Sequence, residues 1–179
     1  MLKTLALLRG VNVGGHTVKM ERLRELFEQM GCTGVSTHIQ SGNVLFDATG
    51  EQEGILANRL STGLQAALGF EVPVMVLSAQ ELAGILDANP FARRELAEGE
   101  RLYVTVLERN PSAEVVAGLT ADPRSTDEFA VAGRAAWVLC RGGYHKTAYS
   151  NGFFEKKLKM RATTRNLEVM EKLLELARA

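Results

Sequence analysis

The stretch LLRGVNVGGH, residues 7–16, ends an apolar run on an arginine and then continues as a glycine-rich loop. The apolar run predicts a short β-strand over residues 2–8, with Arg9 at its exit. Glycines allow backbone N–H groups to point toward one anion, and an arginine adds a two-pronged donor for phosphate or carboxylate. The stretch therefore predicts half of an anion-binding site. The alternative is a tight loop with a structural arginine.

The residues after this strand alternate between helical and strand patterns as far as residue 78. Apolar periodicity predicts a helix over 20–30, strands over 35–39 and 44–46, a helix over 55–68 and an edge strand over 72–77. This β-α-β-β-α-β order is the split pattern of a ferredoxin-like sandwich. Right-handed crossovers place the first strand in the middle of the sheet, antiparallel to the third. We therefore expect the loop 9–15 and the turn 40–43 to meet.

The rest of the chain repeats part of this pattern. It predicts a helix over 79–88, a strand over 102–107, a helix over 111–119, a hairpin over 129–140, and helices over 153–158 and from 167 onward. Thr163 or Thr164 is expected to cap the last helix. The fold class is thus α+β with two lobes. Residues 1–78 form the ferredoxin-like βαββαβ sandwich, and residues 79–179 form a related βαββ unit followed by C-terminal helices.

Charge is balanced over the whole chain but not along it. The 21 Lys and Arg residues equal the 21 Asp and Glu residues in number, which argues against a non-specific nucleic-acid coat. Residues 141–166, however, hold seven basic residues and one acidic residue, a net charge of +6. The two cysteines are expected to be free thiols, and no apolar run is long enough for a membrane span. We expect a soluble cytoplasmic protein without a membrane partner.

The richest polar stretch is YSNGFFEKKLKMRATTRN, residues 149–166. Its hydroxyl, amide and basic groups, together with predicted helix starts, favour an anion. The alternative is a solvated basic helix with a threonine cap. We predict that this stretch and the glycine loop line one polar cleft between the lobes. The predicted ligand-binding residues are Arg9, Asn12, Gly14, Ser41, Asn43, Tyr149, Asn151, Thr164, Arg165 and Asn166.

The predicted ligand is a nucleotide, a phosphorylated metabolite or a short nucleic-acid segment, bound weakly and with steep salt dependence. The histidines and cysteines lack metal-ligand spacing, so no metal site and no cofactor are predicted. No general base stands out, and Ser41 lacks a Gly-x-Ser-x-Gly elbow. Catalytic residues are therefore not assigned. Two alternatives stay open: an enzyme of phosphoryl or related group transfer, and a structural or oligomerising protein without a small ligand.

Five blocks of this sequence, in this order, resemble one bacterial family, domain of unknown function 1697: LLRGVNVGG, IQSGNVLF, NPF, YSNGFFEKKL and ATTRN. The resemblance runs from Leu5 to about Leu174. It implies a two-lobed α+β protein of about this length and implies no established activity. That family usually has another small polar or basic residue where His16 stands, so His16 is not taken as a catalyst.

Overall fold

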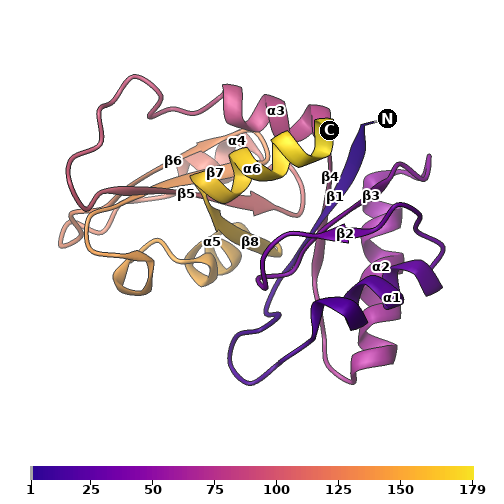
Figure 1. Ribbon diagram of the computed structural model, residues 1–179. Helices are drawn as coiled ribbons and strands as arrows, with labels where there is room; N and C mark the ends of the chain where they lie inside the picture. The colour runs from indigo at the N-terminus through magenta and orange to yellow at the C-terminus, as the bar shows by residue number, and fades with distance from the viewer. Residues whose placement is uncertain (1) are drawn as a thin grey trace. The chain divides into compact units, whose positions relative to one another are not determined.

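The computed structural model describes residues 2–179. Over these residues the chain forms two four-stranded antiparallel sheets and six α-helices (Figure 1). It divides into two units. The first unit runs to Leu82 and also takes in Lys172–Ala179, and the second unit is Ala83–Glu171. The α+β class and the presence of two four-stranded sheets agree with the expectation of two lobes.

The first unit contains β1 (Lys3–Leu8), α1 (Met20–Gln29), β2 (Ser36–Thr37), β3 (Asn43–Asp47), α2 (Glu53–Leu68), β4 (Val74–Ser78) and the start of α3 (Ala79–Asp87). Its strand order is β2-β3-β1-β4, and every neighbouring pair is antiparallel. The prediction that the first strand is central is confirmed. The strand next to Pro73, β4, lies at an edge, as expected from a residue that cannot donate a backbone hydrogen bond.

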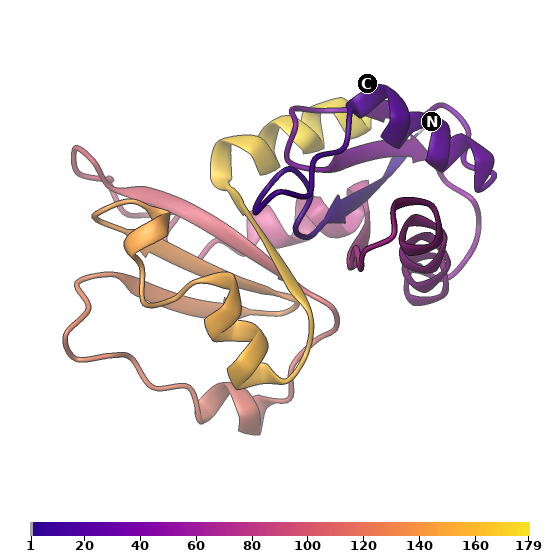
Figure 2. The ribbon, with the colours of Figure 1, turned by 90° about the horizontal axis from the view of Figure 1, so that it is seen from below.

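Helices α1 and α2 cover the same face of the first sheet (Figures 1 and 2). Leu23 and Phe27 of α1 and Leu60 of α2 are buried in one core with Ala6 and Leu8 of β1. The intervening β1 residues face the other side and are buried as well. A strand that buries both faces reads as a continuous apolar run, which is the pattern that the sequence shows.

The end of β1 brings three connections together. The Leu8 N–H donates to the Gly42 carbonyl at 2.8 Å, and the Arg9 N–H donates to the Pro73 carbonyl at 2.9 Å. The glycine loop therefore leaves the sheet between the β2–β3 turn and the segment that leads into β4. The expected meeting of loop 9–15 with turn 40–43 is confirmed.

The second unit contains the rest of α3, then β5 (Arg101–Leu107), α4 (Ala113–Ala117), β6 (Glu128–Ala132), β7 (Ala135–Cys140), a 3-10 turn (Tyr144–Lys146), α5 (Asn151–Leu158), β8 (Ala162–Asn166) and the start of α6 (Leu167–Arg178). Its strand order is β6-β7-β5-β8, again fully antiparallel. The unit thus completes a second β-α-β-β-α-β series. The predicted βαββ unit followed only by helices is wrong, because it omits β8.

The stretch ATTRN is a strand and not a helix start. It pairs with β5 along its whole length, with Thr164 opposite Thr105. The prediction that Thr163 or Thr164 caps the last helix is therefore wrong. Asn166 takes that place, since its Oδ1 accepts the Val169 N–H at 2.8 Å. Threonine suits both caps and strands, and pairing with β5 decides between them.

One face of the second sheet packs against α5. Phe154 and Leu158 of this helix share a core with Leu107, Ala136 and Val138 of the sheet. Trp137 on the opposite face is fully buried and belongs to the core. Helix α4 buries none of its residues, and residues 120, 121, 123 and 124 of the loop after it are exposed. Among residues 2–179, no helix combines the length and apolar character needed to cross a bilayer.

Gly42 has a steric role that can be separated from its backbone conformation. Its φ is 77°, and an added Cβ would lie 2.9 Å from the Leu8 Cβ. We expect Gly42→Ala to lower the free energy of unfolding by about 2–4 kcal/mol, from left-handed strain and overpacking together. Denaturant unfolding followed by far-ultraviolet circular dichroism measures this loss.

The matched control is Gly14→Ala, because Gly14 has a φ of 60° and open space around its Cβ position. Gly14→Ala should lower the free energy of unfolding only by the cost of a left-handed backbone, about 1–2 kcal/mol. Equal losses for the two variants would show that the contact with Leu8 has no energetic weight.

Candidate functional site

The loop after β1 is held in shape by the side-chain amide of Asn12. Its Nδ2 donates to the carbonyl oxygens of Val18 and Gln40, at 3.2 and 2.6 Å. Its Oδ1 accepts the Val18 N–H at 2.8 Å. Asn12 also has a φ of 58°, a conformation that asparagine adopts more readily than most residues. One amide thus ties the two ends of the loop to each other and to turn 40–43.

Asn43 has the same role in the β2–β3 turn. It is fully buried, and its Nδ2 donates to the His38 carbonyl at 3.0 Å and to the Ser41 Oγ at 2.9 Å. The structure therefore brings Arg9, Asn12, Ser41 and Asn43 to one end of the first sheet. Both amides are already used to shape the loops. Ligand contact by these residues stays a prediction.

The tip of the loop, residues 13–17, is exposed. Gly14 and Gly15 have φ values of 60° and 91° there, which L-residues with a side chain rarely adopt. The His16 ring packs on the Phe70 ring with a centroid distance of 4.2 Å. This contact gives His16 a packing role and anchors the tip to the segment between α2 and β4.

Four side chains of the second unit form a hydroxyl and amide cluster between β5, β8 and the start of α5. The Tyr144 hydroxyl donates to Thr164 Oγ1 at 3.0 Å and accepts the Asn151 N–H at 2.7 Å. Thr164 Oγ1 donates to Asn151 Oδ1 at 3.2 Å and lies 2.8 Å from Thr105 Oγ1. Because each hydroxyl has one hydrogen, Thr105 is the donor of the last bond. Thr164 and Asn151 are thus brought together as predicted.

The other predicted residues of this segment are placed differently. The Tyr149 ring is buried, and its hydroxyl accepts the Asp122 N–H at 3.0 Å. Arg165 projects from the face of β8 opposite Thr164, as successive strand residues must. Its guanidinium donates to Thr163 Oγ1 at 2.9 Å, and burial lowers its pKa to about 10. Arg165 remains charged at neutral pH, but it does not belong to the hydroxyl cluster.

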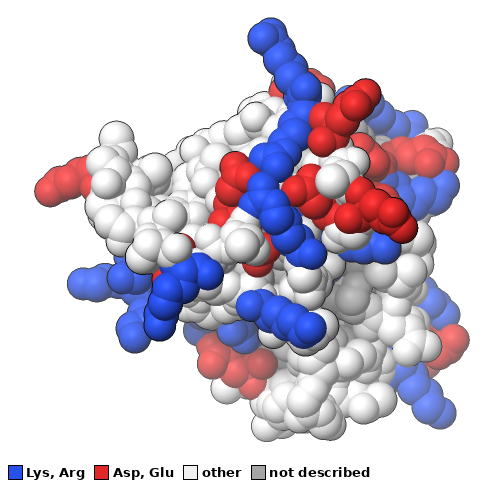
Figure 3. All heavy atoms as spheres, turned by 90° about the vertical axis from the view of Figure 1, so that its left-hand side faces the viewer, with Lys and Arg blue, Asp and Glu red and all other residues white. Residues whose placement is uncertain are grey.

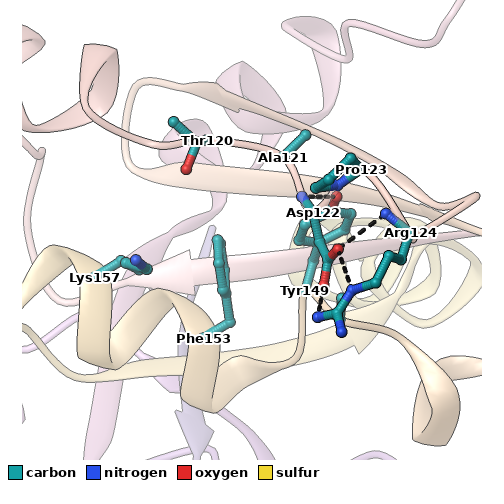
Figure 4. A pocket seen from close by; sticks show the side chains of 9 residues that line it. Thr120, Ala121, Asp122, Pro123, Arg124, Tyr149, Phe153 and Lys157 are labelled. Atoms are coloured by element: carbon teal, nitrogen blue, oxygen red, sulfur yellow. Dashed lines mark hydrogen bonds and ion pairs between the residues drawn. The ribbon is translucent and has the colours of Figure 1, made fainter.

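A cavity of about 470 Å³ lies between α5 and the loop that follows α4. Figure 4 shows Phe153 and Lys157 projecting from α5 toward Thr120 and Ala121 of that loop. The remaining wall is Asp122, Pro123, Arg124, Ala148 and Tyr149. The cavity therefore combines an aromatic ring, a lysine and a hydroxyl, all from the second unit.

The loop side of this cavity is held by bonds to Asp122. The Arg124 N–H and Nε donate to its Oδ1 at 2.9 and 3.1 Å, and the Arg124 guanidinium also donates to Oδ2 at 3.0 Å. These bonds keep the pKa of the Asp122 carboxyl below its usual value. The only carboxylate on the wall is thus paired with a cation of the same wall, and Lys157 supplies the net charge.

The lysines of residues 146–159 differ from most other cations of the protein. Lys3 pairs with Asp47 at 2.7 Å, and Arg94 and Arg141 share Glu100 and Glu128. Among residues 2–179, no carboxylate lies within ion-pair distance of four exposed lysines, Lys146, Lys156, Lys157 and Lys159. On the face drawn in Figure 3, acidic and basic side chains interleave in one part, while other basic side chains stand among uncharged residues.

The thiols are poor candidates for nucleophiles. Cys32 and Cys140 are buried, and burial raises the pKa of both, that of Cys140 to about 11. A thiol with a raised pKa is protonated at neutral pH and unreactive. Across residues 2–179, no three His, Cys, Asp or Glu side chains are grouped as potential metal ligands.

Sequence reasoning missed Tyr144, Thr120 and the cavity-lining role of Phe153. Tyr144 follows a Gly-Gly pair close to Asn151, and this aromatic in a polar loop was a usable signal. Phe153 and Lys157 are four residues apart, which places them on one helix face. Thr120 carries no signal, because only folding of its loop brings it to α5.

Comparison with known proteins places the chain in a family and supports its fold. Residues 1–137 match the family model described as "Protein of unknown function (DUF1697)", well over half of the chain. The chain belongs to the DUF1697 family. The resemblance seen in YSNGFFEKKL and ATTRN lies beyond the matched residues. No curated protein gives a significant match.

The DUF1697 chain is also similar to a solved structure, described as that of the conserved bacterial protein SP0830 from Streptococcus pneumoniae. The two chains are 20% identical, with a TM-score of 0.74 over 100% of this chain and 99% of that one. At this identity the likeness extends to the fold alone.

Asn12 offers a test of how the loop is held. Asn12→Asp keeps the shape and the acceptor but loses both N–H donors, so we expect a loss of about 1–3 kcal/mol in the free energy of unfolding. Gln40→Ala is the control, since only the Gln40 backbone is used by Asn12. It should change stability by less than about 0.5 kcal/mol. Two equal effects in thermal or denaturant unfolding would contradict the role given to the Asn12 amide.

Two substitutions of Arg165 separate the energetic cost of burying its charge from the stability gained by packing its aliphatic stem. Arg165→Met keeps an unbranched apolar stem and removes the guanidinium, so we expect a melting temperature equal to or above that of the wild type. Arg165→Ala also removes the stem and should lower the melting temperature. If the methionine variant melts as low as the alanine variant, the bond to Thr163 stabilises β8 by more than desolvation costs.

Proposed function

We propose that this DUF1697 protein binds an anionic ligand through the basic segment of its second unit. The observation that carries the proposal is the group of exposed lysines between residues 146 and 159 that have no carboxylate partner in the described chain. Surface cations that are already paired have little left to offer a ligand, whereas unpaired ones attract phosphate groups. The ligand class is a nucleotide, a phosphorylated metabolite or a short nucleic-acid segment.

The net charge of the whole chain limits the strength of this binding. The net charge is zero, so no long-range field adds to the local +6 of residues 141–166. Binding is therefore weak at physiological salt, with a dissociation constant of about 10⁻⁵–10⁻⁴ M, and strengthens as salt is lowered.

The loops of the first unit remain part of the proposal. Arg9 and Gly14 supply a guanidinium and an exposed backbone, and Asn12, Ser41 and Asn43 hold that backbone in place. That this group shares one ligand with Tyr149, Asn151, Thr164, Arg165 and Asn166, in a cleft between the two predicted lobes, stays a proposal.

We also infer that both sheets follow the ferredoxin-like arrangement, the first within the predicted lobe 1–78 and the second within the predicted lobe 79–179. The support is the same element order in each unit and the corresponding strand orders, β2-β3-β1-β4 and β6-β7-β5-β8. Localisation in the cytoplasm is proposed from the two buried free thiols, which suit a reducing compartment.

Neutralising the lysines tests the proposed function. The variant replaces Lys156, Lys157 and Lys159 with Gln, and the probe is a fluorescent single-stranded oligothymidylate at low salt. We expect affinity to fall at least about tenfold, and the slope of log K against log salt to decrease by about 0.7 for each lost phosphate contact. Fluorescence anisotropy over a salt series measures both.

The control removes the same charge elsewhere. It carries Gln at Lys19, Arg93 and Arg101, three exposed cations without an ion pair in the described structure. At the points of the salt series near 0.1 M its affinity should stay within about threefold of the wild type, because exposed charges that do not contact the strand are screened over about 10 Å at that salt. Equal losses for the two triple variants, or no binding by the wild type, would refute the proposed function.

A further inference from the structure

We propose that the cavity beside α5 takes up an unpaired base of a single-stranded nucleic acid, with the base against Phe153 and the adjoining phosphates along the α5 lysines. This inference rests on the proposed anion binding and names its ligand. The family match and the similar solved structure assign no role to this cavity.

The wall has the two components that such a ligand requires. Single-strand binding combines aromatic side chains, on which bases stack, with cations that follow the backbone. Phe153 is half-buried at the cavity wall, and Lys157 lies one helical turn further along the same face. Figure 4 shows both side chains on the α5 side, opposite Thr120 and Ala121.

The aromatic ring is held in place rather than free to rotate. The Phe153 ring lies nearly perpendicular to the rings of Tyr149 and Phe154, with centroid distances of 5.4 and 5.1 Å, and its centroid lies 5.7 Å from that of Phe129. A ring fixed by its neighbours loses little conformational entropy when a base stacks on it. The apolar side chains of Ala121 and Pro123 complete a surface suited to a flat ring.

The opposite wall is also preformed and does not repel an anion. The Tyr149 hydroxyl holds the Asp122 backbone, and Arg124 occupies both oxygens of the Asp122 carboxylate. The remaining charge on the wall is that of Lys157, and the Thr120 hydroxyl adds a donor or acceptor for the base edge.

The position of the other lysines favours a strand over a single nucleotide. Lys156 and Lys159 are exposed at the end of α5 but do not line the cavity. A mononucleotide in the cavity reaches Lys157 alone, whereas a strand places further phosphates beside the two outer lysines. The cavity therefore holds one base, and the lysines hold the backbone that enters and leaves it.

The experiment compares oligothymidylate with an abasic chain of the same length, which keeps every phosphate and lacks the bases. Anisotropy is measured at low salt for the wild type and for Phe153→Leu, whose melting temperature is recorded to show that it folds. We expect the wild type to prefer the thymidylate by roughly fivefold to a hundredfold, and Phe153→Leu to lose most of this preference while binding the abasic chain as before.

A second variant avoids the aromatic core. Ala121 is exposed on the loop wall, and Ala121→Glu places a carboxylate in the cavity without disturbing Phe153. It should weaken thymidylate binding more than abasic binding. As a charge-matched pair, Lys157→Met should reduce the base preference, because its ammonium neighbours the stacked base, and Lys156→Met should leave it unchanged.

The outcomes separate this inference from the proposed function. If the lysine triple variant loses affinity but the abasic chain binds as well as the thymidylate, anion binding stands and the base pocket is refuted. Thymidine monophosphate that competes as well as the strand, or a duplex that binds equally well, overturns the single-strand assignment. Absence of any binding to the wild type refutes both.

Discussion

Each sheet is organised around a central strand that must satisfy hydrogen bonds on both edges and bury both faces. β1 pairs with β3 and β4, and β5 pairs with β7 and β8, all antiparallel. The middle of such a strand is therefore mostly apolar, and its backbone N–H and C=O groups are paired on both sides. Polar groups therefore collect where the strand ends, in the loops that leave it. In the first unit this is the glycine loop after β1.

The two units stabilise their polar loops in different ways. In the first, the amides of Asn12 and Asn43 satisfy backbone groups of their own loops. In the second, the hydroxyls of Tyr144 and Thr164 join the start of α5 to the sheet. Saturated amides and hydroxyls are structural, because a group already bonded must lose that bond to reach a ligand. The proposed binding rests instead on the exposed lysines and on the half-buried Phe153 ring at the cavity wall, which belong to α5 and its C-terminal end.

The sequence supported the prediction of the first sheet and of the meeting between the Arg9 loop and the Ser41 turn, because short-range periodicity and the handedness of crossovers restrict strand order. It also located the basic segment, since charge is counted directly from composition. It could not reveal the cavity beside α5. Its far wall comes from residues 120–124, about thirty residues before Phe153, and the Tyr149 hydroxyl accepts the Asp122 N–H of that loop.

The difference between what the sequence determines and what the tertiary structure decides is clearest at ATTRN, residues 162–166. By itself the sequence determined the apolar strands, the amphipathic helices and the turn glycines, whose signals are local. Only the tertiary structure decided that Thr163 and Thr164 form β8, that Asn166 caps α6, and that Arg165 projects to the face opposite Thr164. Threonine is compatible with a cap and with a strand. The choice depends on hydrogen bonds to β5, whose Thr105 lies far away in the chain and comes within reach only once the sheet has formed.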